Sequence, residues 1–154
     1  MTDWQLAQLN IATLIAPIDS PALADFVANL DRINALADSA PGFVWRLKED
    51  LCNSSDADQP FGDDKIVNMS VWESVESLHN YVYRTAHAQI MSRRKEWFER
   101  MSEAYSVLWW VPAGHQPDLL EAKDKLDLLR HEGAGSEVFT FKSVAPQPVQ
   151  VTPR

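Results

Sequence analysis

Apolar and polar residues alternate along several segments of the chain, and this alternation predicts β-strands because successive strand side chains point to opposite faces. The clearest case is 65–72, where Ile66, Asn68, Ser70 and Trp72 share one face and three apolar residues share the other. The expected strands are 6–15, 43–48, 65–72 and 105–111, with a last strand at 137–141.

Apolar residues recur every three or four positions between these strands, which predicts helices. One helix is expected to begin at Pro21, because proline is favoured at the first helical position, and to end before Pro41. Serine and threonine are good N-terminal caps, so Ser74 begins a short helix and Thr85 begins a longer one over 86–101. A last helix is expected over 118–131, ended by a glycine.

The predicted order β-α-β-β-α-β is typical of an α+β, ferredoxin-like fold, in which an antiparallel sheet carries its helices on one face. The last helix and strand are appended to this unit. The chain length fits one domain, predicted over 1–145, and the proline-rich segment 146–154 is expected to be a flexible tail.

A ferredoxin-like sheet leaves its second face to be covered by a partner or an equivalent element. Uncharged amide and indole side chains are unusual on a sheet face that is exposed to solvent. They are typical of a half-closed pocket that orients a mostly apolar ligand. We expect this face to carry Gln8, Asn10, Asn68, Ser70 and Trp72, with Phe43 and Trp45, or alternatively Val44 and Arg46, from the second strand.

Charge, cysteine content and hydropathy indicate which partners and which cellular compartment to expect. The net charge of −8 argues against binding to the phosphate backbone of a nucleic acid. A single cysteine, Cys52, cannot form an internal disulfide, which fits a reducing cytoplasm. Residues 1–10 lack the basic head and apolar run of a signal peptide, and no stretch is apolar enough to span a membrane. We therefore expect a soluble, cytoplasmic protein with no membrane partner.

Two basic residues, His87 and Arg94, extend the apolar stripe of the predicted helix 86–101. A buried guanidinium needs a partner, so Arg94 meets a carboxylate in a structural ion pair or faces an anionic ligand. At a helix N-terminus the dipole favours the neutral imidazole of His87, the form that a general base or metal ligand needs. The structural interpretation is that His87 tethers the helix N-terminus.

Several blocks of the chain resemble a known family. The segments VNMSVWESVESLHNYVYRTAH (67–87), RRKEWF (93–98) and LWWVPAGHQP (108–117) are similar to the family called domain of unknown function 3291, within the dimeric α+β-barrel superfamily. The resemblance covers roughly residues 5–142. It implies a ferredoxin-like protomer that pairs with a second copy, sheet against sheet, and it implies no particular reaction.

The superfamily includes cofactor-independent monooxygenases, haem-degrading monooxygenases, isomerases and stress-response proteins. Some of its monooxygenases use an Asn, a Trp and a His at places comparable with Asn10, Trp72 and His87. In the haem degraders the His binds iron, and in the others such groups hold and deprotonate a phenolic substrate. Because a fold does not fix a function, the resemblance leaves these alternatives open.

Three hypotheses follow. The first is a small homodimeric enzyme that acts on an apolar or aromatic metabolite without a nucleotide cofactor, by monooxygenation or by proton transfer in an isomerase or cyclase. In it His87 moves protons, and Arg94 or Tyr83 steadies negative charge. The second is a haem protein with His87 as axial ligand, and the third is a non-enzymatic stress-response or ligand-carrier dimer. The predicted substrate-binding residues are Asn10, Trp45, Asn68, Ser70, Trp72 and Trp97.

Overall fold

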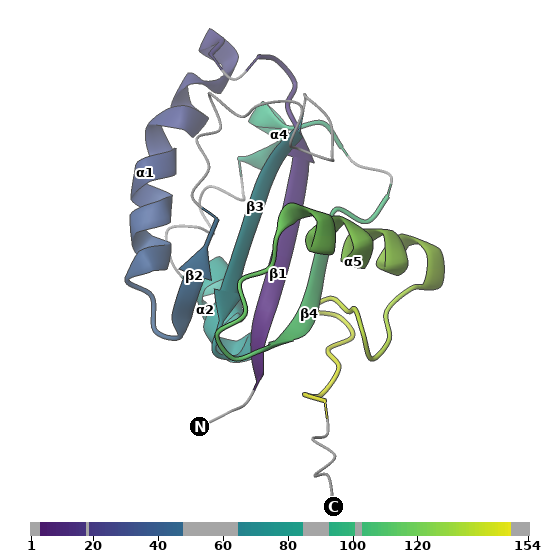
Figure 1. Cartoon of the computed structure of the whole chain (residues 1–154). Helices are drawn as coiled ribbons and strands as arrows, with labels where there is room; N and C mark the ends of the chain where they lie inside the picture. The colour runs from purple at the N-terminus through teal and green to yellow at the C-terminus, as the bar shows by residue number, and fades with distance from the viewer. Residues whose placement is uncertain (1–3, 18, 48–64, 85–92, 101–102, 149–154) are drawn as a thin grey trace, which may run out of the picture.

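A four-stranded antiparallel sheet forms the centre of the computed structural model, which describes residues 4–17, 19–47, 65–84, 93–100 and 103–148 (Figure 1). The strand order is β2-β3-β1-β4, so β1 and β3 are the central strands. The strands are β1 (Trp4–Thr13), β2 (Phe43–Arg46), β3 (Lys65–Trp72) and β4 (Ser106–Pro112).

Helices follow the strands in the predicted order. They are η1 (Pro21–Leu23), α1 (Ala24–Asp38), α2 (Val75–Arg84), α4 (Arg94–Trp97) and α5 (Leu119–Glu132). Together with the antiparallel pairing of β1 with both β3 and β4, this order confirms the predicted α+β, ferredoxin-like fold with an appended C-terminal helix. None of the described helices combines the length and the apolar character needed to cross a membrane.

Local sequence signals explain where the helices begin and end. The Asp118 carboxylate accepts a hydrogen bond from the Glu121 amide at the start of α5, and Gly133 ends this helix with a φ of 79°. The Ser74 hydroxyl accepts a hydrogen bond from the Ser77 amide at the start of α2. These contacts satisfy backbone groups that a helix end leaves unpaired, as the sequence predicts.

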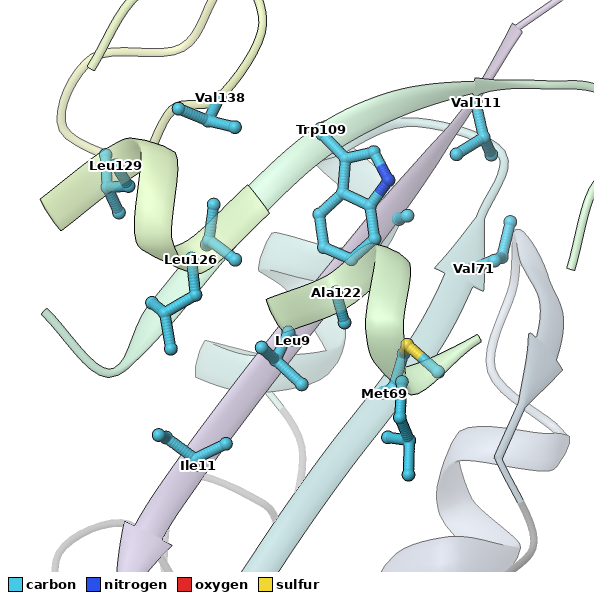
Figure 2. Close-up of a cluster of buried hydrophobic side chains, with 13 residues drawn as sticks. Leu9, Ile11, Met69, Val71, Trp109, Val111, Ala122, Leu126, Leu129 and Val138 are labelled. Atoms are coloured by element: carbon cyan, nitrogen blue, oxygen red, sulfur yellow. The ribbon is translucent and has the colours of Figure 1, made fainter. Parts of the chain in front are cut away.

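One face of the sheet is covered by α5, which crosses in front of the strands in Figure 1. Figure 2 shows its side chains Ala122, Leu126 and Leu129 directed at the strands. All three are buried, and so are the strand residues beneath them: Ala7, Leu9, Ile11, Met69, Val71, Val107, Trp109 and Val111. This face is therefore covered by a helix of the same chain.

The opposite face packs against α1, α2 and α4 in two separate apolar clusters. The first joins Leu6 and Trp72 of the sheet to Ala37 of α1 and to Leu78 and Tyr81 of α2. The second joins Ile66 of the sheet to Leu23, Phe26 and Trp97. The part of the sheet between the two clusters is polar.

This arrangement corrects the predicted division between the two faces. The residues expected on an uncovered face, among them Asn10, Asn68 and Trp72, lie on the face that α1 and α2 cover. The apolar residues expected under these helices lie beneath α5 instead. The reason is that both faces carry apolar side chains, and strand alternation alone does not say which helix covers which face.

Two predicted elements differ from those observed. The helix expected over 86–101 ends at Trp97, because Phe98 pairs with Leu14 in a β-bridge and the Glu99 amide donates to the Thr13 carbonyl. The strand expected over 137–141 is reduced to one bridge, between Leu108 and Phe139. Residues 85–92 lie outside the described part of the chain, as do 149–154 of the predicted tail.

Candidate functional site

Four uncharged polar residues meet in the middle of the sheet, and we call them the polar strip: Gln8, Asn10, Asn68 and Ser70. In the register of β1 against β3, Gln8 lies opposite Ser70 and Asn10 lies opposite Asn68. All four therefore share one face, the face of α1 and α2, between the two apolar clusters. The sequence predicts this shared face correctly for all four.

Gln8 holds the strip together. Its side-chain nitrogen Nε2 donates to Asn68 Oδ1 at 2.6 Å and to Ser70 Oγ at 2.8 Å. Gln8 and Ser70 are both buried, so water does not compete with the bond between them, whereas the bond to Asn68 is partly open to water. Both hydrogens of the Gln8 amide nitrogen are used, and this fixes the orientation of the neighbouring side chains.

Trp72 closes one end of the polar strip. Its indole Nε1 donates to Ser70 Oγ at 2.7 Å, and its ring is buried. The Tyr81 ring stacks on it with a centroid distance of 5.1 Å, and the Phe43 ring meets it edge-on at 5.4 Å. Aromatic contacts of this kind restrict the ring, so Trp72 is a fixed hydrogen-bond donor.

Asn68 is exposed, although it lies on a central strand and its neighbours on the same face, Ile66 and Ser70, are buried. The helical layer therefore leaves the sheet open at this point. Beside it, the Asn10 side-chain oxygen Oδ1 is buried and makes no hydrogen bond. A buried acceptor without a partner costs free energy, so Asn10 is a strained point of the strip beside the exposed Asn68.

An ion pair lies beside the polar strip without adding net charge to it. Arg46 of β2 lies opposite Ser70 of β3 in the sheet register. Its guanidinium binds both carboxylate oxygens of Asp38 from α1, at 2.7 and 3.2 Å. Such a bidentate pair neutralises both charges, so the described surroundings of the strip favour an uncharged ligand.

Burial raises the pKa of the Tyr81 hydroxyl to about 12, against the opposing effect of the Arg46 charge. The hydroxyl donates to the Ile33 carbonyl of α1 at 2.9 Å, which links α2 to α1. Tyr81 is therefore a neutral structural group that supports Trp72.

Replacing Tyr81 with Phe is expected to lower the free energy of unfolding by about 1 kcal/mol near pH 8, because one buried hydrogen bond is lost. Between pH 10 and pH 12 the unfolded chain loses the Tyr81 proton while the folded chain keeps it, so the wild type loses stability over this range. The difference in the free energy of unfolding between wild type and Tyr81→Phe should therefore become smaller over this range. Urea titrations at pH 10 and pH 12 would measure it. A difference that is independent of pH would contradict this.

Trp45 does not join the polar strip. A bulge in the register between Phe43 and Trp45 leaves Phe43 beside Trp72, whereas Trp45 packs into the cluster beneath α5. The prediction that Trp45 shares a face with Asn10 and Asn68 is therefore wrong. The alternative residue, Arg46, is the one that lies beside Ser70.

Two other predicted site residues have separate surroundings. Tyr83 is 56 % exposed, and its ring contacts His79 and Phe141 at the surface. Trp97 is buried in the second apolar cluster against Phe26, with a ring distance of 5.4 Å. Neither contact brings the ring to Gln8 or Asn68.

The two basic residues predicted for the site cannot be placed. His87 lies outside the described residues, and Arg94 begins α4 with a side chain that is likewise outside the description. Its neighbour Arg93 makes ion pairs with carboxylates, which is one of the alternatives expected for Arg94. It binds Glu96 at 2.8 Å and Asp25 of α1 at 2.9 Å, which raises the pKa of Arg93, and it lies 4.7 Å above the Trp97 ring.

The polar strip consists of amides and one hydroxyl, which are not axial ligands of haem iron. The haem hypothesis therefore depends on His87, outside the described residues. Elsewhere in the described part of the chain, no group of three or more His, Cys, Asp or Glu residues could hold a metal ion.

The sequence alone does not reveal the structural roles of Gln8 and Tyr81 in the site. Alternation places Gln8 on the polar face, but its position as the donor to two neighbours depends on the β1–β3 register. Tyr81 reads as one apolar residue of an amphipathic helix, and its contact with Trp72 depends on how α2 packs.

Comparison with solved structures finds several chains of similar shape. A protein of unknown function from Nitrosomonas europaea is 16% identical, with a TM-score of 0.47, and covers 75% of this chain and 97% of its own. The cofactor-independent oxygenase SnoaB from Streptomyces nogalater is 17% identical, with a TM-score of 0.45 and the same coverage. A protein from Pseudomonas aeruginosa is 13% identical, with a TM-score of 0.46, and covers 70% of this chain and 92% of its own. Likeness at this level says nothing about the activity of this chain.

Comparison with curated proteins finds no match. The sequence pattern of one family, domain of unknown function (DUF3291), matches residues 5–153. This match covers nearly the whole chain and agrees with the resemblance of segments 67–87, 93–98 and 108–117. The chain therefore belongs to the DUF3291 family.

Proposed function

We propose that the polar strip binds an uncharged, mostly aromatic metabolite, and that the protein transforms it without a nucleotide cofactor. The observation that carries this proposal is the exposure of Asn68 on a central strand, on the face that helices otherwise cover. A side chain in that position is normally buried, so the opening is a feature that a closed core would lack.

The composition around the opening supports a ligand site rather than a solvent surface. Apolar clusters lie at both ends of the strip, with Trp72 at one end and Ile66 at the other. Between them are amides and a hydroxyl in fixed orientations. Small-molecule sites have this character: mostly apolar walls with a few placed polar groups.

We assign the substrate-binding role to Asn10, Asn68, Ser70 and Trp72. Trp45 and Trp97 are left out because they pack into clusters elsewhere. Tyr83 is also left out because its contacts lie at the surface. The proton-transfer role of His87 and the charge-stabilising role of Arg94 come from the sequence alone, and we retain both as proposals.

For the reaction we propose monooxygenation or a proton transfer such as isomerisation or cyclisation, which are activities found in the superfamily that the chain resembles. The resemblance leads us to propose a homodimer, and the single cysteine, Cys52, leads us to propose a cytoplasmic location. Because α5 covers the second face of the sheet, a second copy would contact α5 rather than bare strands.

Binding can be tested by titrating ¹⁵N-labelled protein with 1-naphthol and following the indole N–H resonance of Trp72. We expect this resonance to shift in a saturable way, because Trp72 lies at the end of the strip. The Trp109 indole, held by Glu121 on the α5 face, is the internal control and should not move. Equal shifts of both indoles, or no shift at all, would contradict the proposal.

Turnover can be tested with the same probe. Oxygen uptake reports monooxygenation, and exchange of ring hydrogens for deuterium in D₂O reports acid–base chemistry. Replacing His87 with Ala should abolish the faster of the two reactions, whereas replacing His79, which packs against Tyr83, should not. Saturable binding with neither reaction would favour the ligand-carrier hypothesis instead.

A further inference from the structure

Trp109 lies at the inner end of a chain of hydrogen bonds on the α5 side of the sheet. Its indole Nε1 donates to Glu121 Oε2 at 3.0 Å, and Glu121 Oε1 bonds to His115 Nε2 at 2.6 Å. Trp109 is buried, Glu121 is half-buried and His115 is exposed, so the chain leads from the core to the surface. We propose that Trp109 and Glu121 form a one-electron redox site, in which the indole is oxidised while its N–H proton passes to the carboxylate. This site is separate from the polar strip, which lies on the other face.

The bonds to Glu121 make its carboxylate the proton acceptor of the site. When this carboxylate is ionised, both of its oxygens only accept hydrogen bonds, so the hydrogen in the contact with His115 is on Nε2. The Glu121 backbone amide also donates to Asp118 Oδ1 at 2.8 Å, which fixes the residue in the first turn of α5. The acceptor is therefore held against the indole N–H, and the proton moves along a bond that already exists.

The carboxylate favours oxidation of this particular ring. Removing one electron from an indole leaves a radical cation whose N–H group is a strong acid. The partly buried position of the pair strengthens the attraction between this cation and the Glu121 carboxylate. Transfer of the proton to Glu121 removes both charges, so the products are a neutral Trp109 radical and a neutral carboxylic acid. Oxidation coupled to this transfer therefore leaves no uncompensated charge in the core.

The oxidant class is a neutral one-electron oxidant such as a peroxyl radical, because the net charge of −8 repels an anion such as superoxide. The peroxyl radical takes the electron and becomes a peroxide anion, which takes a proton from water to give a hydroperoxide. A thiolate can return the electron and become a thiyl radical, while Glu121 gives its proton back to the indole. The oxidant need not enter the core, because Glu121, which contacts the indole, is itself partly exposed.

Within the described residues, the other hydrogen-bonded indoles have acceptors that are poor bases. Trp72 donates to a serine hydroxyl and Trp110 donates to a backbone carbonyl, and neither group holds a proton at neutral pH. Trp97 lies 4.7 Å from the Arg93 guanidinium, whose positive charge opposes the loss of an electron from the ring. We therefore expect Trp109 to be oxidised before these three tryptophans.

The test uses photogenerated tris(bipyridine)ruthenium(III), which accepts an electron but no proton. In the full wild-type chain, transient absorption should show the neutral tryptophan radical, and this radical should form more slowly in D₂O than in H₂O. After exposure to peroxyl radicals from an azo initiator, mass spectrometry should find more oxidised indole at Trp109 than at Trp72 or Trp110. Equal oxidation of these three residues, or equal rates in the two solvents, would overturn the proposal.

Replacing Glu121 with Gln keeps the shape of the acceptor and removes its capacity to take the proton. We expect the neutral radical to form about 10-fold more slowly, the difference between a charged and a neutral hydrogen-bond acceptor. The matched control, Glu132→Gln at an exposed position of the same helix, should keep the wild-type rate. An unchanged rate in Glu121→Gln would overturn the proposal and leave the polar strip unaffected.

Two neighbouring tryptophans supply a second matched pair. Trp109→Phe should remove most of the radical signal, whereas Trp110→Phe should keep it, because the Trp110 indole donates to a carbonyl. A signal that persists in Trp109→Phe would also overturn the proposal. Circular dichroism checks the fold of each variant, and the rate in Glu121→Gln decides the question if Trp109→Phe does not fold.

Discussion

Replacing Trp109 with Ala is expected to lower the free energy of unfolding by about 3–5 kcal/mol, the usual cost of removing a large buried aromatic side chain. The Trp109 ring is 1 % exposed and packs between the strands and α5, as Figure 2 shows. Its indole also donates to Glu121 at 3.0 Å, so the substitution removes a link to the first turn of α5. Urea unfolding followed by far-ultraviolet circular dichroism measures the change.

The control for this prediction is Leu120→Ala, on the outer side of α5, where the side chain is 67 % exposed. This substitution should change stability by no more than about 0.5 kcal/mol. If Trp109→Ala cost less than about 1 kcal/mol, α5 would not be packed on the sheet in solution, and the second face would be open to a partner.

Replacing Gln8 with Leu is expected to weaken the binding of 1-naphthol by roughly 10- to 50-fold, while stability falls by only about 1 kcal/mol. The binding loss follows because Gln8 orients Asn68 and Ser70, and two hydrogen bonds at roughly 1 kcal/mol each set their positions. Stability changes little because Leu fills a similar volume, Asn68 is exposed to water, and Ser70 keeps its bond from Trp72.

Isothermal titration and urea unfolding of the same sample separate these two effects. Gln116→Leu, at an exposed position outside the sheet, is the matched control and should change neither quantity. Unchanged naphthol affinity in Gln8→Leu would show that the hydrogen-bond network does not form the site, whatever its effect on stability.

The strands were predictable because alternation carries through β1 and β3 without interruption. The observed β3 has the predicted bounds, and the β1–β3 register brings Gln8, Asn10, Asn68 and Ser70 to one face as expected. The ends of α5 were predictable because Asp118 and Gly133 are strong capping residues. In these places the local sequence and the tertiary structure agree.

The faces of the sheet were not predictable from alternation. Leu9, Met69 and Val71 form a fully apolar face, which needs a helix as much as the face containing Trp72 does. Which helix covers which face depends on the connections: α5 takes the apolar face that was expected to lie under α1 and α2, and these two helices take the face that a second copy was expected to cover. The bulge that turns Trp45 away from the strip is a one-residue irregularity, and the sequence of a short strand gives no sign of it.

The helix before β4 shows a conflict between local pattern and tertiary pairing. Residues 97–98 continue the apolar helical stripe, yet Phe98 bridges to Leu14 and α4 stops at Trp97. Backbone pairing with the end of β1 replaces the helical bonds there, as the bond from the Glu99 amide to the Thr13 carbonyl shows. Helical spacing is a local pattern, so it could not indicate that these residues pair with a strand from a distant part of the chain.

The central claim is that the α1 and α2 face of the sheet holds a ligand at the polar strip. A crystal structure of the full chain grown with 1-naphthol tests this most directly. We expect the naphthol ring between Trp72 and Ile66, with its hydroxyl oxygen within hydrogen-bond distance of a side chain of the polar strip. A ring bound beneath α5, or an Asn68 buried by side chains of the protein itself, would contradict the claim.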